Sequence, residues 1–252
     1  MIQNKKTILI VAVFVIFLVA GCSSPVDVNM GQDNSNDGPV EQSDVNTVVD
    51  NTQSVTETPP ETASFSATYK IEFIADWSAS THPDYYPADA HFSPFVAYSH
   101  NNSVNSRIFS VGQVPSRGVE EMSESGKTDD LIKEIGDLMD LDFAYVQTKG
   151  NRIDSPGVDS AELRFTQDYD YVTFVSMLAP SPDWFVSGSI NLMAGDQWVD
   201  TAEVTLVTYD SGGDDGDTLT SKDQDSNPKQ VVTVFNSHLQ GLGKIILTKV
   251  GE

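Results

Sequence analysis

The sequence has a single cysteine, Cys22, so its folded part can contain no intrachain disulfide. Basic residues are also scarce, because 14 Lys and Arg stand against 37 Asp and Glu, for a formal net charge of -23 at pH 7. A chain this acidic has no basic surface to meet phosphates, which argues against nucleic-acid binding. An acidic surface instead suits solubility, cations and basic partners.

Several enzyme signatures are absent as well. There is no Gly-x-Ser-x-Gly elbow to present a nucleophilic serine, and no glycine-rich loop to hold a phosphate. His82, His91 and His100 are evenly spaced, but they lack a cysteine or a close histidine pair and so form no zinc motif. We expect them to hydrogen-bond loops at the margin of the core, in a protein that is not an enzyme.

The longest apolar run lies at the N-terminus. Lys5 and Lys6 precede residues 7–20, which are almost wholly apolar, too short for a comfortable membrane span and of the length of a signal-peptide core. The run ends in Val19-Ala20-Gly21-Cys22, which resembles the lipobox of bacterial lipoproteins. The resemblance implies that residues 1–21 are a lipoprotein signal peptide, cleaved before Cys22, and that Cys22 carries lipid.

Lipid on Cys22 would anchor the chain to a membrane. Ser23 stands where inner-membrane retention usually takes Asp, which favours the outer membrane of a bacterial envelope, with the domain in the periplasm or at the cell surface. Residues 22–64 are predicted to be the lipidated cysteine followed by a disordered acidic tether. The tether contains no Lys or Arg and too little apolar surface to offset its ordering entropy.

The pattern changes from residue 65 onward. Residues 69–77 alternate as in a half-buried strand, and 128–139 carries apolar residues at helical spacing with Thr128 as a plausible N-cap. Asp168 to Asp170 predicts a hairpin turn. About eight short strands with one principal helix predict an all-β fold, an antiparallel β-sandwich with helical insertions, over residues 65–252. The other expected strands are 92–98, 107–111, 161–167, 171–178, 184–192, 202–209, 230–235 and 243–250.

Two acidic turns flank two of these strands. Asp183 precedes residues 184–192, whereas Asp210, Asp214 and Asp215 follow residues 202–209. If the two strands pair as antiparallel neighbours, the start of one lies beside the end of the other, and the carboxylates converge. Converging carboxylates repel unless a cation joins them, and Ca²⁺ before Mg²⁺ suits oxygen ligands on irregular loops. The alternative is that these residues are solvated turn residues, since Asp is common in turns.

The Ser-Pro-Asp-Trp element at 181–184 and the Tyr-Asp-Ser-Gly-Gly-Asp turn at 209–214 are specific when taken together. With the other landmarks they resemble one family, the N-terminal spondin domain known from F-spondin and mindin of the animal extracellular matrix. The resemblance covers most of residues 69–235. The other landmarks are Trp77, His82-Pro83, His91-Phe92-Ser93-Pro94, Ser116-Arg117-Gly118-Val119, Glu124, Gly126 and Ser160-Ala161-Glu162-Leu163.

The resemblance implies a C2-like antiparallel sandwich that binds one calcium ion in loops at one end. It makes Asp183, Asp210 and Asp214 the carboxylate ligands, with backbone carbonyl groups and water completing the shell. Two departures stand out. The animal domains use disulfides, which are absent here, and the second turn continues as Asp214-Asp215-Gly216-Asp217, which is more acidic than usual.

These features predict a surface-tethered, calcium-binding lipoprotein that acts as a non-catalytic adhesion module for an unknown protein or glycan ligand. One alternative is a structural envelope protein whose calcium serves only rigidity. Another is a glycan or ester hydrolase, because a catalytic carboxylate pair is recognised only by its separation in space.

Overall fold

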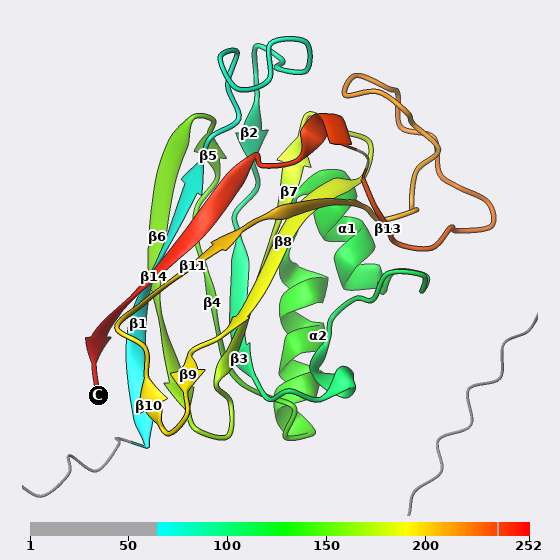
Figure 1. Ribbon diagram of the computed structural model, residues 1–252. Helices are drawn as coiled ribbons and strands as arrows, with labels where there is room; N and C mark the ends of the chain where they lie inside the picture. Colours follow the sequence, from blue (N-terminus) through cyan, green and yellow to red (C-terminus); the bar gives the residue numbers. More distant parts are fainter. Residues whose placement is uncertain (1–64, 236) are drawn as a thin grey trace, which may run out of the picture. The chain divides into compact units, whose positions relative to one another are not determined.

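The computed structural model describes residues 65–235 and 237–252. They form two principal antiparallel β-sheets, with two α-helices lying against one of them (Figure 1). The prediction of an all-β antiparallel sandwich with helical insertions is confirmed. The predicted signal peptide, Cys22 and the predicted tether lie outside the described residues, among which no helix is long and apolar enough to cross a membrane.

The first sheet has four strands, and β1 (Ser66–Ala75) lies inside it between two long neighbours. Residues of β1 alternate between half-buried and buried along the whole strand, as expected when one face packs on a core. The sheet order is β11 (Thr201–Thr205), β14 (Gly243–Gly251), β1 and β6 (Gly157–Thr166).

The second sheet has eight strands and is organised around β7 (Tyr171–Ala179), which is buried on both faces. Its order is β13 (Thr233–Val234), β12 (Val207–Asp210), β8 (Trp184–Asn191), β7, β2 (His91–Phe92) and β5 (Ile153–Asp154). Further along β7, β3 (Val96–His100) pairs with it and with β4 (Ala144–Lys149). A separate pair joins β9 (Met193–Ala194) to β10 (Gln197–Trp198).

Two apolar layers hold these elements together. Between the sheets, Phe73 of β1 meets Phe92 and Phe174 of the second sheet with ring centroids 5.0 and 4.9 Å apart. On the outer face of the second sheet, helix residues such as Met122 and Leu131 pack in a second apolar cluster. This cluster explains why β7 is covered on both faces.

The two helices are α1 (Arg117–Ser125) and α2 (Asp129–Asp140), and short 3₁₀ turns lie at Val104–Ser106 and Ser237–Leu239. Ser116 caps α1, because its hydroxyl accepts from the Val119 N–H. Thr128 stands at the N-cap position of α2, as predicted, but its side chain makes no capping hydrogen bond.

Four expectations need correction. Residues 107–111 contain no strand, and residues 202–209 divide at Leu206, with β11 in the first sheet and β12 in the second. Asp168 to Asp170 do not close a hairpin, because β6 and β7 belong to different sheets. Lastly, one principal helix was expected and there are two, and α1, β4, β5, β9 and β10 were not predicted. The division at Leu206 and the missing hairpin have one reason, because a strand pattern identifies a buried face and not the partner that covers it.

Candidate metal centre

The two acidic turns meet at one end of the second sheet. β8 begins directly after Asp183, β12 ends at Asp210, and their antiparallel register places Asp210 opposite Trp184. The turn after β12 then folds back over Asp183, and the backbone N–H of Asp214 donates to Asp183 Oδ2 at 3.1 Å. The structure therefore brings all three predicted residues into one loop cluster.

Asp183 is the centre of this cluster and is fully buried. Its Oδ2 accepts three hydrogen bonds, from Ser211 Oγ at 2.9 Å, from the Gly213 N–H at 2.7 Å and from the Asp214 N–H. Its Oδ1 is buried and accepts none. Burial raises the pKa of Asp183 and the charge of Asp214 adds to the rise, while the three hydrogen bonds oppose it.

Asp210 and Asp214 each cap a tight turn of their own loop. Asp210 Oδ1 accepts from the Gly212 N–H at 2.9 Å, and Asp214 Oδ1 accepts from the Gly216 N–H at 2.6 Å. Asp214 Oδ2 also accepts from the Gln224 N–H. Burial, and then the charge of Asp183, raise the pKa of Asp210 to about 6. The three carboxylates thus repel one another electrostatically in a partly buried environment.

Helix α1 contributes a fourth carboxylate, Glu124, to the same cluster. Its Oε1 is buried and accepts no hydrogen bond, and burial raises the pKa of Glu124 to about 7, with Lys229 opposing the rise. The approach is close, because a Cβ atom added at Gly213 would lie 2.4 Å from Glu124 Oε1. Sequence reasoning placed Glu124 among the family landmarks, but without α1 it gave no signal that this side chain faces the turn.

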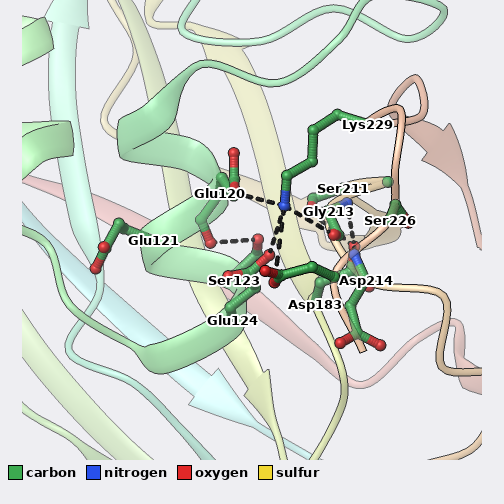
Figure 2. A network of polar contacts seen from close by, with 12 residues as sticks. Glu120, Glu121, Ser123, Glu124, Asp183, Ser211, Gly213, Asp214, Ser226 and Lys229 are labelled. Carbon is green, nitrogen blue, oxygen red and sulfur yellow. Dashed lines mark hydrogen bonds and ion pairs between the residues drawn. The ribbon is translucent and has the colours of Figure 1, made fainter. Parts of the chain in front are cut away.

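Lys229 supplies the positive charge at this cluster (Figure 2). Its Nζ lies 2.7 Å from Glu120 Oε1 and 3.8 Å from Glu124 Oε1, and it donates to the Gly213 carbonyl at 3.0 Å. An ammonium group therefore stands between the helix carboxylates and the turn. The turn after β12 therefore already interacts with one positive charge, the ammonium group of Lys229.

The carboxylate oxygens of this cluster are suitable ligands for a hard cation, although they are not already arranged around a common point. In residues 65–235 and 237–252, no three His, Cys, Asp or Glu side chains are arranged so that they could hold a metal ion. Asp210 and Asp214 are turned toward loop N–H groups instead. Within this cluster, one buried oxygen of Asp183 and one of Glu124 accept no hydrogen bond, and both are carboxylate oxygens, the ligand type that Ca²⁺ prefers.

The family model described as Spondin_N matches residues 67–241, which include both turns and α1. The chain belongs to the spondin N-terminal domain family. Spondin-2 of Homo sapiens is 32% identical over 177 residues, which cover 68% of this chain and 53% of that protein. Spondin-1 of Rattus norvegicus is 28% identical over 180 residues, covering 68% of this chain and 22% of that protein. The chain therefore spans only part of these relatives.

Three histidines of this spondin domain, His82, His91 and His100, hydrogen-bond loops and strands, as predicted. His82 Nε2 lies 3.1 Å from the Gln240 carbonyl oxygen, and His91 Nδ1 lies 2.7 Å from the Asp89 carbonyl oxygen. His100 is buried, with its Nε2 atom 2.8 Å from Thr173 Oγ1. The three rings thus serve separate loops.

Proposed function

We propose that this spondin domain is a calcium-binding, non-catalytic module that is held at a bacterial envelope by lipid on Cys22 and binds a protein or glycan ligand. The observation that carries the calcium assignment is Asp183, a fully buried carboxylate with one oxygen that accepts no hydrogen bond. Three hydrogen bonds satisfy its Oδ2 atom but bring no positive charge, so the buried charge of Asp183 remains costly and a cation would compensate it.

The residues that would hold the ion are Asp183, Asp210 and Asp214, with Glu124 added from α1. A divalent ion would offset the mutual repulsion of these carboxylates and would tie α1 to the turn after β12. Backbone carbonyl groups and water would supply the remaining oxygen ligands that Ca²⁺ takes. We propose no catalytic step, because the carboxylates of the cluster are buried or used as turn caps.

Calorimetric titration of the unlipidated mature chain with CaCl₂ tests the metal. We expect saturable binding to the native protein and none to the Asp183→Ala/Asp210→Ala double variant. An Asp196→Ala variant, changed at an exposed position on another turn, should bind as the native chain does. The assignment fails if the native protein gives no saturable heat, or if the double variant gives the same heat.

Glu124 needs a test of its own, because only the structure, and not the sequence, indicates that it is a calcium ligand. Glu124→Gln keeps the size of the side chain and removes its charge, so calcium should bind at least several-fold more weakly. Glu121→Gln is the matched control, since it lies on the same helix and pairs with Lys127 at 3.4 Å. Equal calcium affinity of the two variants would remove Glu124 from the ligand set.

The anchor is tested by metabolic labelling with palmitate and by membrane fractionation. We expect label and membrane association in the native chain, and neither in a Cys22→Ser variant. Absence of label in the native chain would contradict the lipid anchor, independently of the result of the calcium titration.

A ligand-binding role differs measurably from a purely structural role of calcium. In pull-downs from envelope extracts, a ligand retained with calcium and lost with chelator supports the binding module. If calcium raises the melting temperature but no ligand is retained, the structural alternative is favoured. Turnover of a glycan or ester panel that disappears with one carboxylate substitution would overturn the non-catalytic proposal.

A further inference from the structure

A hollow lies on the outer face of the second sheet, and its lining contains none of the four carboxylates Asp183, Asp210, Asp214 and Glu124. We call it the Arg107 groove. It has a volume of about 450 Å³, within the range of small-ligand sites. It lies between residues 101–111 and strands β7, β8 and β12. The lining residues used below are Arg107, Phe109, Tyr171, Thr173, Ser189 and Tyr209.

The floor of the Arg107 groove is polar and uncharged. Thr173 Oγ1 of β7 lies 3.0 Å from Ser189 Oγ of β8 and 2.8 Å from Nε2 of the buried His100. Ser187 adds a third hydroxyl group to the lining. Burial lowers the pKa of His100, which keeps the ring neutral near pH 7. Because Thr173 donates its hydroxyl proton to Ser189 Oγ, the floor offers a ligand the Ser189 hydroxyl as a donor and hydroxyl oxygens as acceptors.

Arg107 is exposed at the edge of this floor. Among the residues that the structure describes, it forms no ion pair, whereas Arg117 and Arg152 pair with Asp130 and Asp154 at 2.6 and 2.8 Å. The carboxylate of Asp170, which acts electrostatically on His100, is instead engaged by Asn191 Nδ2 at 2.6 Å. An unpaired guanidinium on a chain of charge -23 is available to an external anion.

Aromatic rings form the walls, and they are held in place by packing. Phe109 meets Tyr209 at 5.1 Å between ring centroids, and Tyr209 stacks on Phe185 at 5.3 Å. Beyond the groove, the same segment is fixed by backbone hydrogen bonds from the Gly112 N–H to the Val232 carbonyl and from the Val232 N–H to the Gln113 carbonyl. A groove fixed in this way loses little entropy when a ligand binds.

We propose that the Arg107 groove binds a sugar that carries a carboxylate, a hexuronate unit of a glycan. The carboxylate pairs with the planar guanidinium of Arg107, which matches it in a bidentate manner. The sugar hydroxyls bond the Thr173 and Ser189 hydroxyls, while its apolar face packs on the tyrosine rings. A monoanion is preferred to a phosphate group, because one cation on so acidic a protein cannot compensate a second negative charge.

This inference rests on the proposed role as a ligand-binding module and names the class of its glycan. It does not depend on calcium. The proposed calcium site and the Arg107 groove share no residue, so either assignment can be wrong without affecting the other.

The test is an NMR titration of the unlipidated mature chain with methyl β-D-glucuronide in EGTA at physiological salt. We expect saturable shifts for residues of the groove, and at least tenfold weaker binding for Arg107→Gln, since the charge-assisted pair with the carboxylate is lost. Ser189→Ala should weaken binding a few-fold. Arg164→Gln, at an exposed position of β6 in the first sheet, should bind as the native chain does.

Several outcomes would overturn the inference. One is the absence of saturable shifts with the glucuronide. Equal binding of methyl β-D-glucoside, or equal binding by Arg107→Gln, would show that the carboxylate is not recognised. Tighter binding of a glucose phosphate or of a free peptide carboxylate would assign the groove to another ligand class. Calcium calorimetry on chelator-free portions of the same protein preparations is read separately, so a lost metal site and an empty groove are distinguishable.

Discussion

One carboxylate, Asp183, organises the acidic end of this domain. Three donors from residues 211–214 converge on its Oδ2 atom, so the turn is built around a buried negative charge. The opposing Oδ1 atom is left without a hydrogen bond. The same residue therefore supports the local fold and makes the site costly without a cation.

Asp183→Asn separates these two roles. The amide oxygen can still accept from the turn, so without calcium the free energy of unfolding at pH 7 should be equal to the native value or higher. With calcium at 100 times its Kd, the native protein should gain about 2.7 kcal/mol and the variant nothing. Thermal melts with calcium and with EGTA measure both effects. An equal calcium response of the two proteins would contradict the site.

His100 predicts a pH dependence of stability. Burial lowers its pKa below 6.5, with Arg107 adding to the effect and the Asn101 carbonyl and Asp170 opposing it. The unfolded chain then binds the proton more readily, so the contribution of His100 is complete above pH 6.5. It is lost as pH falls through the lower pKa of the folded state.

Urea unfolding at pH 7.5 and 5.5 checks this expectation when native protein and His100→Gln are compared. The glutamine variant should be less stable at pH 7.5, and the difference should shrink at pH 5.5. Taking the difference cancels the opposite contributions of Asp210 and Glu124, whose raised pKa values favour the folded state at low pH. A difference that grows at low pH would be contrary to a neutral buried ring.

At the scale of elements, α1 is positioned by its ends. Ser116 starts it with a side-chain cap, and Gly126 ends it with φ of 70°. Gly126 also lies against the second sheet, because a Cβ atom there would be 3.0 Å from Ser93 Cβ. This helix end sets the position of Glu124, which precedes it by less than a turn.

Gly126→Ala should therefore destabilise the domain by roughly 1–2 kcal/mol, because alanine is strained in the left-handed region and meets Ser93. Gly136→Ala is the matched control within α2. It has open space around its Cβ position and should be neutral or stabilising by up to about 1 kcal/mol. Chemical denaturation measures both, and equal effects of the two substitutions would refute the role of the left-handed cap.

At the scale of the whole molecule, the sandwich is held by aromatic rings from strands that are far apart in the chain. Phe73 of β1 lies among Phe92, Phe95 and Phe174, with ring centroids 4.9 to 6.5 Å away. These contacts join the first sheet to the second.

Phe73→Ala should lower the free energy of unfolding by about 3–5 kcal/mol, through lost burial and the cavity that remains. Phe65→Ala, at a residue that is 78% exposed, should change it by less than about 0.5 kcal/mol. Urea denaturation of the two variants gives the comparison. A small effect at Phe73 would mean that the two sheets are joined mainly elsewhere.

The sequence by itself determined which residue types gather where along the chain. Period-2 alternation predicted β1, apolar runs predicted β7 and β8, and the positions of Asp183 and Asp210 at strand ends indicated that the two turns would meet. Both inferences rest on local patterns, because alternation and turn chemistry act over a few residues.

Only the tertiary structure decided which strands are partners and which side chains face them. It divided the chain at Leu206 between two sheets, brought Glu124 of α1 beside Gly213, and placed Arg107 over strands it does not adjoin in sequence. The physical reason is that a strand pattern defines a buried face but not its partner. That choice depends on the packing of the whole sandwich.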